Sequence, residues 1–159
     1  MTLTATPLPT PETLATLVTN VTQTMFGLSF SLEAGRGCAW DEPRCPTWQA
    51  AVLPIPGKRP LTVAIAADGT ACRTLAAAMF SCEPGGVDAS MVHDSLAEIV
   101  NIVAGQVKSA LGLDQALGLP KVVDQGHGLW ALPDRWRSAT LSRGATRTVV
   151  WVAVTEQIL

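Results

Sequence analysis

The sequence predicts an α+β domain in which a largely antiparallel sheet is covered on one face by long helices. Two patterns predict this fold class. Apolar residues recur at helical spacing in three stretches, and shorter apolar or alternating stretches bounded by turn residues are typical of strands. Along the chain the predicted order is helix, strands, helix, helix, strands. This order favours antiparallel neighbours over repeated strand–helix–strand units.

The first predicted elements are an amphipathic helix and a short strand. Thr10 is a suitable N-cap, Pro11 is a favoured first helical residue, and Gly27 can end the helix. Between them the apolar residues keep to one helical face (Leu14, Leu17, Val18, Val21 and Met25). Residues 28–33 then alternate apolar and polar side chains, which predicts a strand with Leu28, Phe30 and Leu32 on one face. Residues 35–46 are predicted to form a loop.

The remaining elements follow from turn residues and capping residues. Residues 48–55 and 61–66 bracket a Pro-Gly-Lys-Arg-Pro turn and predict a hairpin. Asp68 opens a short helix that carries Leu75, Ala76, Met79 and Phe80. After the break at 84–86, Asp88 or Ser90 can cap a long helix that runs to Gly112. Residues 120–124 look extended, and residues 135–141 and 146–155 are predicted to pair with each other.

Length and composition limit the class of protein. A chain of 159 residues is one ordinary domain, and we expect residues 1–159 to form it, with residues 1–10 flexible. With 48% hydrophobic and 15% charged residues the chain is not intrinsically disordered. No apolar run approaches the roughly 20 residues of a membrane-spanning helix, and the N-terminus does not resemble a secretory signal, so the cytoplasm is the expected location. The net charge of −2 argues against nucleic acid as the main partner.

The cysteines and histidines do not form a metal-binding pattern. Neither His93 nor His127 lies near a matching set of ligands, and no two cysteines have the spacing of a zinc ribbon. Cys72 and Cys82 fall on an apolar helical stretch, where buried thiols are expected. Cys38 and Cys45 flank a proline-containing loop; free thiols are favoured there over a disulfide, because nothing else indicates an oxidising compartment.

Residues 94–111 of the long helix carry the pattern most relevant to function. At about 100° per residue, five residues that differ in chemistry fall within an arc of about 80°; they are Asp94, Glu98, Asn101, Gly105 and Lys108. Leu96, Ile99, Val100, Val103, Val107 and Leu111 occupy the opposite side and are expected in the core. A solvated surface is the simplest interpretation of the five. Two residues argue for a docking surface instead: asparagine is a poor choice in an exposed helix, and a helical glycine costs about 1 kcal/mol.

The surroundings of this helix are acidic. Between Thr62 and Val107 the only basic residue is Arg73, against five acids, which are Asp68, Glu83, Asp88, Asp94 and Glu98. A partner that presents a lysine would therefore be favoured at this surface.

The segment from Asp94 through Glu98 to Asn101 resembles the D-x3-E-x2-N motif of the CheC/CheX/FliY chemotaxis phosphatases. The run from Asn101 to Gly105, with Gly118-Leu-Pro120 downstream, is similar to CheX in particular. Pro120 lies closer to Asn101 than in the fullest form of the motif, and residues 35–48 have no counterpart in the family pattern. The resemblance extends over most of the chain and implies the pseudo-twofold plan of this family.

The resemblance implies hydrolysis of the acyl phosphate on a CheY-like response regulator. Asn101 would orient the attacking water and Glu98 would bind the regulator's active-site lysine, whereas Asp94, Gly105 and Lys108 would contact the partner. The chain would need no cofactor of its own, because the regulator would supply Mg²⁺. The resemblance and the expected exposed strand edges together imply a homodimer.

An internal comparison supports a single site. Residues 14–19 can be laid on residues 96–101, which places Thr16 where Glu98 stands and Thr19 where Asn101 stands. The first half therefore has the helix without the chemistry.

Two alternatives stay open at the level of sequence. One is a regulator-binding or scaffold module with the same fold and no catalysis. The other, a nucleic-acid surface built from Arg135, Trp136, Arg137, Arg143 and Arg147, is disfavoured by the acidic balance of the chain.

Overall fold

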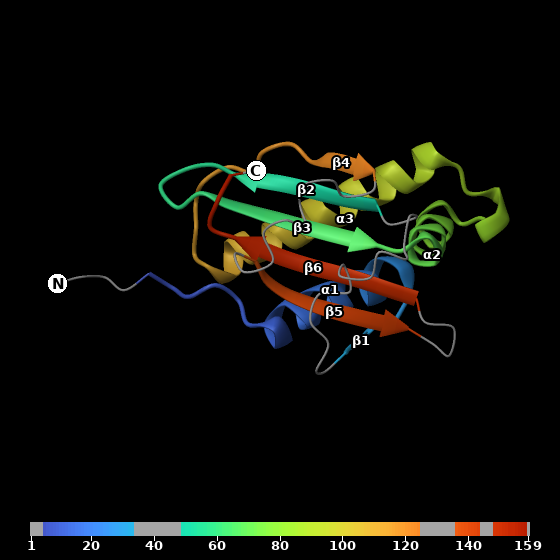
Figure 1. The fold of residues 1–159 in the computed structure, drawn as a ribbon, viewed down its shortest axis with the longest axis horizontal. Coiled ribbons are helices and arrows are strands. Elements are labelled where there is room, and N and C mark those ends of the chain that lie inside the picture. The colour runs from blue at the N-terminus through green and yellow to red at the C-terminus, as the bar shows by residue number, and fades with distance from the viewer. Residues whose placement is uncertain (1–4, 34–48, 125–135, 144–147, 159) are drawn as a thin grey trace.

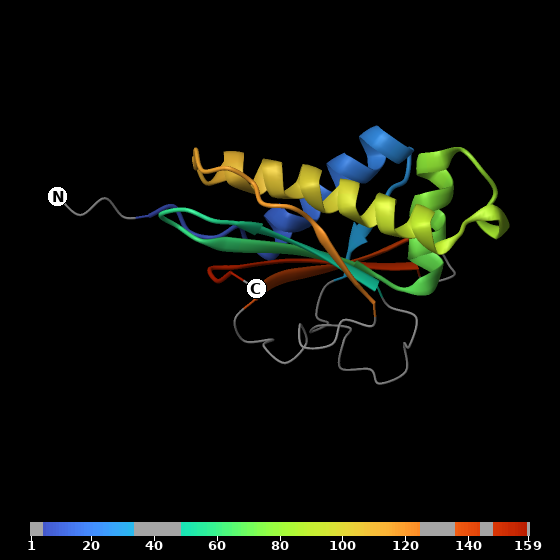
Figure 2. The same cartoon turned by 90° about the horizontal axis from the view of Figure 1, so that it is seen from above.

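The computed structural model describes residues 5–33, 49–124, 136–143 and 148–158. They form one antiparallel sheet with the helices on one of its faces (Figures 1 and 2). The predicted α+β class with a largely antiparallel sheet is therefore confirmed. Among the helices of the described residues, none combines the length and apolarity that crossing a membrane would require.

Within the described residues three α-helices cover the sheet, and each begins at a side chain that caps it. α1 spans Pro11–Phe26 after Thr10, whose side chain accepts a hydrogen bond from the Thr13 N–H, and it ends at Gly27 in the left-handed conformation. α2 spans Gly69–Phe80 after the Asp68 cap, and the short 3₁₀ helix η2 spans Pro84–Gly86. α3 spans Ala89–Ala110. The Asp88 carboxylate caps it by accepting the Met91 N–H at 2.9 Å, which decides between Asp88 and Ser90.

In the part of the chain that the structure describes, the sheet has six strands in the order β1-β5-β6-β3-β2-β4. They are β1 (Ser31–Leu32), β2 (Gln49–Ile55), β3 (Leu61–Ala67), β4 (Lys121–Asp124), β5 (Arg137–Arg143) and β6 (Thr148–Thr155). The predicted hairpins β2–β3 and β5–β6 are both present, and β3 pairs with β6 at the centre of the sheet. The edge strands β1 and β4 each follow a long helix in sequence. This order is compatible with a pseudo-twofold plan, which stays a prediction.

The first strand is shorter than the sequence predicts. Only Ser31 and Leu32 pair with β5, although residues 28–33 alternate as expected. Phe30 is buried and Leu28 packs against the core, but Leu32 is 39% exposed. β1 lies at the edge of the sheet, where it has one neighbouring strand. The alternation of apolar and polar residues therefore covers more residues than the backbone pairing with β5 does.

The main core lies between the helices and the sheet. α1 contributes Leu14 and Val18, α3 contributes Ile99 and Val103, and the inward side chains of β2, β3, β5 and β6 complete the layer. The opposite face of the sheet is also buried over its centre, with Trp151 among small side chains such as Ala64 and Ala66. Buried apolar side chains on both faces account for the continuously apolar sequences of β3 and β6.

Candidate functional site

The residues that the sequence singles out lie along one side of α3. Asp94, Glu98 and Asn101 are exposed, and Gly105 and Lys108 are half-buried. The six residues expected on the opposite side are all buried; they are Leu96, Ile99, Val100, Val103, Val107 and Leu111. Because these buried side chains fix the rotation of α3 about its axis, the five residues form one continuous surface, which we call the α3 face.

Glu98 and Asn101 are one helical turn apart at the centre of the α3 face. Side chains at i and i+3 have Cβ atoms about 5–6 Å apart, so one small partner surface can reach both. Within the part of the chain that the structure describes, neither side chain takes part in a hydrogen bond or an ion pair. Neither group is therefore held by the fold itself, and both are available to a partner.

Gly105 leaves an opening in the α3 face. A Cβ atom at this position would meet nothing within 4 Å among the described residues, so close packing against them does not explain the glycine. A helical glycine costs about 1 kcal/mol relative to alanine. The structure thus removes the packing explanation of Gly105 and leaves docking as the alternative.

The acidic residues near α3 differ in what they do. Asp68 and Asp88 serve as caps of α2 and α3, and the Asp68 carboxylate also accepts the Val149 N–H at 3.3 Å. Glu83 is exposed, as are Asp94 and Glu98. The negative charge available to a partner is therefore concentrated on the N-terminal half of the α3 face and the turn before it.

The corresponding side of α1 has no comparable chemistry. The Thr16 hydroxyl donates to the Glu12 carbonyl at 3.0 Å, and the Thr19 hydroxyl donates to the Phe30 carbonyl at 3.2 Å. Both groups are held by the fold, in contrast to Glu98 and Asn101. α1 does border a hollow next to β1, which the sequence pattern does not predict. Glu12 is the single charged residue in α1, and it is the only residue of this helix whose chemistry could have suggested a binding site there.

The cysteines only partly follow the sequence prediction. Cys72 is buried as expected, and burial is the main cause that raises the pKa of its thiol to about 12. Cys82 was predicted to be buried on a helix, and this prediction is wrong: the residue is exposed. The reason is local, because α2 ends at Phe80 and Ser81 adopts a left-handed conformation. Cys38 and Cys45 lie outside the described residues.

No group of three histidine, cysteine, aspartate or glutamate side chains in the described ranges could hold a metal ion. In the described part of the arginine-rich C-terminal hairpin, the two tryptophan rings pack against each other. Trp136 is half-buried, and its ring meets that of Trp151 edge-on, with centroids 5.7 Å apart. Arg137 and Arg143 are exposed, and the other two arginines of the predicted patch, Arg135 and Arg147, lie outside the described residues.

Comparisons with known proteins agree with this architecture. The model of the family described as "Chemotaxis phosphatase CheX" matches residues 50–141, which is more than half of the chain and includes the whole α3 face. A search of curated proteins found no significant match.

Solved structures share the fold at low sequence identity. The chemotaxis protein CheX from Vibrio vulnificus is 18% identical, with a TM-score of 0.64 over 89% of this chain and 93% of that chain. CheX in a CheX–CheY–BeF₃–Mg²⁺ complex from Borrelia burgdorferi is 15% identical, with a TM-score of 0.63 over 94% of this chain and 100% of that chain. CheX from Desulfovibrio desulfuricans is 15% identical, with a TM-score of 0.61 over 91% and 96%. On the match to the family model, supported by this common fold, the chain belongs to the CheX family of chemotaxis phosphatases.

Proposed function

We propose that this protein removes the phosphoryl group from the active-site aspartate of a CheY-like response regulator, with the α3 face as its docking and catalytic surface. The observation that carries the proposal is the exposure of Glu98 and Asn101, one turn apart and without partners in the described residues, on the central helix of a CheX-family fold. The complex of the Borrelia burgdorferi relative with CheY supports this class of partner.

Asn101 acts by positioning water. A carboxamide both donates and accepts hydrogen bonds, so it can hold a water molecule in line with the phosphorus without acting as a base. The water oxygen forms a bond to phosphorus while the bond between phosphorus and the aspartyl oxygen breaks. Inorganic phosphate leaves, and the regulator's carboxylate is restored. Mg²⁺ belongs to the regulator, and this chain supplies no cofactor of its own.

Glu98 fixes the register of the complex. Its carboxylate pairs with the lysine of the regulator's active site, a charge-assisted contact that directs Asn101 to the phosphoryl group one turn away. Since Glu98 contributes binding, its loss should raise KM more than it lowers the maximal rate.

The rest of the α3 face extends the contact. Asp94, Gly105 and Lys108 bind the partner on either side of the central pair, and the 14 steps from Asp94 to Lys108 span about 21 Å of helix. Asp94 attracts a basic partner, Gly105 permits close approach, and Lys108 meets an acidic group. Asp94, Gly105 and Lys108 thus determine which partner binds, whereas the hydrolysis itself depends on Asn101.

The proposed assembly is a cytoplasmic homodimer joined through strand edges. β1 and β4 are the edges of the sheet, and such strands pair readily with a second copy. Light scattering at micromolar concentration should give twice the mass of the chain; the mass of a monomer contradicts this part of the proposal.

The test measures phosphate release from a CheY-type receiver domain phosphorylated with acetyl phosphate in Mg²⁺. Wild-type protein should accelerate the release, and Asn101→Ala should lose about 10²-fold of that acceleration. Glu98→Gln should act through KM. Gln106→Ala, a half-buried position on α3 about 80° around the helix from Glu98, is the matched control.

The outcomes separate catalysis from docking. Wild-type acceleration by Asn101→Ala contradicts the mechanism. Binding of the phosphorylated receiver without any acceleration by the wild-type protein contradicts the phosphatase and identifies a non-catalytic regulator-binding module.

A further inference from the structure

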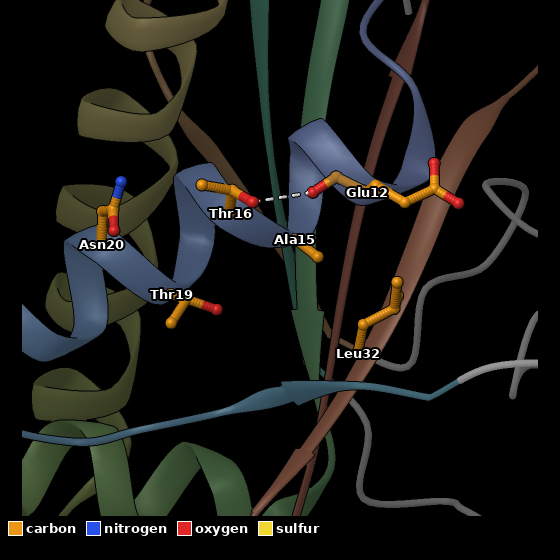
Figure 3. Close-up of a pocket in the computed structure, with 6 residues that line it drawn as sticks. All are labelled: Glu12, Ala15, Thr16, Thr19, Asn20 and Leu32. Carbon is orange, nitrogen blue, oxygen red and sulfur yellow. Dashed lines mark hydrogen bonds between the residues drawn. The ribbon is translucent and has the colours of Figure 1, made fainter.

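A hollow of about 310 Å³ lies between α1 and the edge strand β1, apart from the α3 face. Its lining consists of Glu12, Ala15, Thr16, Thr19, Asn20 and Leu32 (Figure 3). In Figure 3 Ala15 and Leu32 project toward each other from helix and strand, and Asn20 lies toward the opposite end of the drawn stretch of α1 from Glu12. Its volume lies at the lower end of the roughly 300–1,000 Å³ typical of ligand pockets, and it has room for one long side chain.

The floor of the hollow is apolar and partly open. Ala15 is almost fully buried, while Leu32 keeps 39% of its surface exposed despite being a large aliphatic residue. An aliphatic chain laid on Leu32 and Ala15 would remove apolar surface from water on both sides of the contact. The floor therefore favours a ligand with a hydrocarbon stem.

The hydroxyl groups of the hollow present acceptors. The Thr16 proton is engaged by the Glu12 carbonyl and the Thr19 proton by the Phe30 carbonyl. Since each proton is already donated, each hydroxyl oxygen can only accept a further hydrogen bond. A ligand group here must donate hydrogen bonds, which disfavours carboxylates and phosphates.

Glu12 adds negative charge at one end of the hollow (Figure 3). It is exposed, it has no ion-pair partner among the described residues, and it is the only charged side chain in α1. A cationic donor is therefore favoured over a neutral one. The hydrogen-bond acceptors of Glu12, Thr16 and Thr19 lie at separate points along α1. This arrangement suits the compact ammonium of a lysine better than the planar guanidinium of an arginine, which binds paired acceptors.

We propose that this hollow binds a lysine side chain of a partner protein, as a second docking point distinct from the α3 face. The stem lies on Leu32 and Ala15, and the ammonium donates to Glu12 and to the Thr16 oxygen. At the other end the Asn20 carboxamide, which both donates and accepts, matches a backbone peptide group. That match favours a lysine within a polypeptide over a free amine.

The test is an NMR titration of the full chain with the peptide acetyl-Gly-Lys-Gly-amide. Backbone shifts should move at residues 12–20 and 31–32. Two peptides serve as controls: one carries norleucine, which keeps the stem without the charge, and one carries Nε-acetyl-lysine, which keeps a donor without the charge. Either control binding as well as the lysine peptide contradicts the proposal, as does the absence of shifts in these residues.

Two variants test whether the lysine peptide binds in the hollow. Glu12→Gln should weaken lysine binding about two- to fivefold, the range of an exposed ion pair, whereas Glu83→Gln, a change at another exposed acid, should not. Thr16→Lys places a cation four residues after Glu12, which stabilises α1 and occupies the hollow from within the chain. This variant should stay folded, with a melting temperature equal to that of the wild type or slightly above it, while losing the peptide. Unchanged binding by Thr16→Lys overturns the proposal without touching the assignment of Asn101.

Discussion

Replacing Gly105 by alanine should stabilise the protein and at the same time weaken its action on a phosphorylated receiver. The stability gain comes from helix propensity, which favours alanine by about 1 kcal/mol within a helix. Since the added methyl group meets nothing within 4 Å, no clash reduces the gain. For a chain of this length, about 1 kcal/mol corresponds to a rise of about 2–4 °C in melting temperature.

The loss of activity comes from the partner's side. If the regulator approaches the backbone of α3 at Gly105, the methyl group overpacks the contact at a cost of about 1 kcal/mol, or about fivefold in kcat/KM. The assay is receiver dephosphorylation over a range of receiver concentrations, alongside calorimetry of the same preparation. The two effects have opposite sign, so general damage to the fold cannot imitate them.

Gly112→Ala is the matched control. A Cβ atom there also meets nothing within 4 Å, but the backbone has a φ of +65°, which costs an alanine about 1 kcal/mol. This variant should lower the melting temperature and leave the receiver assay unchanged. Activity equal to wild type in Gly105→Ala would refute the docking explanation, and a lower melting temperature in that variant would refute the propensity argument.

Three other predictions concern stability and thiol chemistry. Asp68→Ala removes both a helix cap and the acceptor of the Val149 N–H, so urea unfolding should show a loss of about 1–2 kcal/mol, more than for Asp88→Ala, which removes a cap alone. A thiol reagent at pH 8, read by peptide mass spectrometry, should label Cys82 and spare Cys72 until the protein unfolds. Because the folded pKa of Cys72 is raised from 9.0 to about 12, its unfolded form loses the proton first, and this thiol should lower stability as pH rises from about 9 to 12. Labelling of Cys72 in the folded protein, or equal losses in the two cap variants, would contradict these expectations.

The elements with strong local signals were predictable. Thr10, Pro11 and Gly27 mark both ends of α1 correctly, because capping is decided within one helical turn. The core side and the exposed side of α3 were also predictable, since a long helix repeats its pattern several times. The same repetition is enough to place Glu98 and Asn101 on one exposed turn from the sequence alone.

The elements that depend on distant parts of the chain were less predictable. The sequence predicts Phe80 within the short helix but does not show that it is the last residue of α2, where its side chain is 42% exposed. The strand order arises only when strands from the two halves of the chain pair, and the hollow beside Leu32 arises only when β1 lies beside α1. The periodicity of apolar residues within one element does not show which other elements that element contacts.

The central position of the last strand has a consequence for synthesis. β6 follows every other described strand in sequence, yet it lies between β5 and β3, and it pairs Val150 with Ala67 of the first half. A chain emerging from the ribosome can form the β2–β3 hairpin and α3 early, but the middle of the sheet stays open until β6 arrives. The apolar edge of β3 is exposed throughout that interval, so slowing translation just before residue 148 should prolong the aggregation-prone stage.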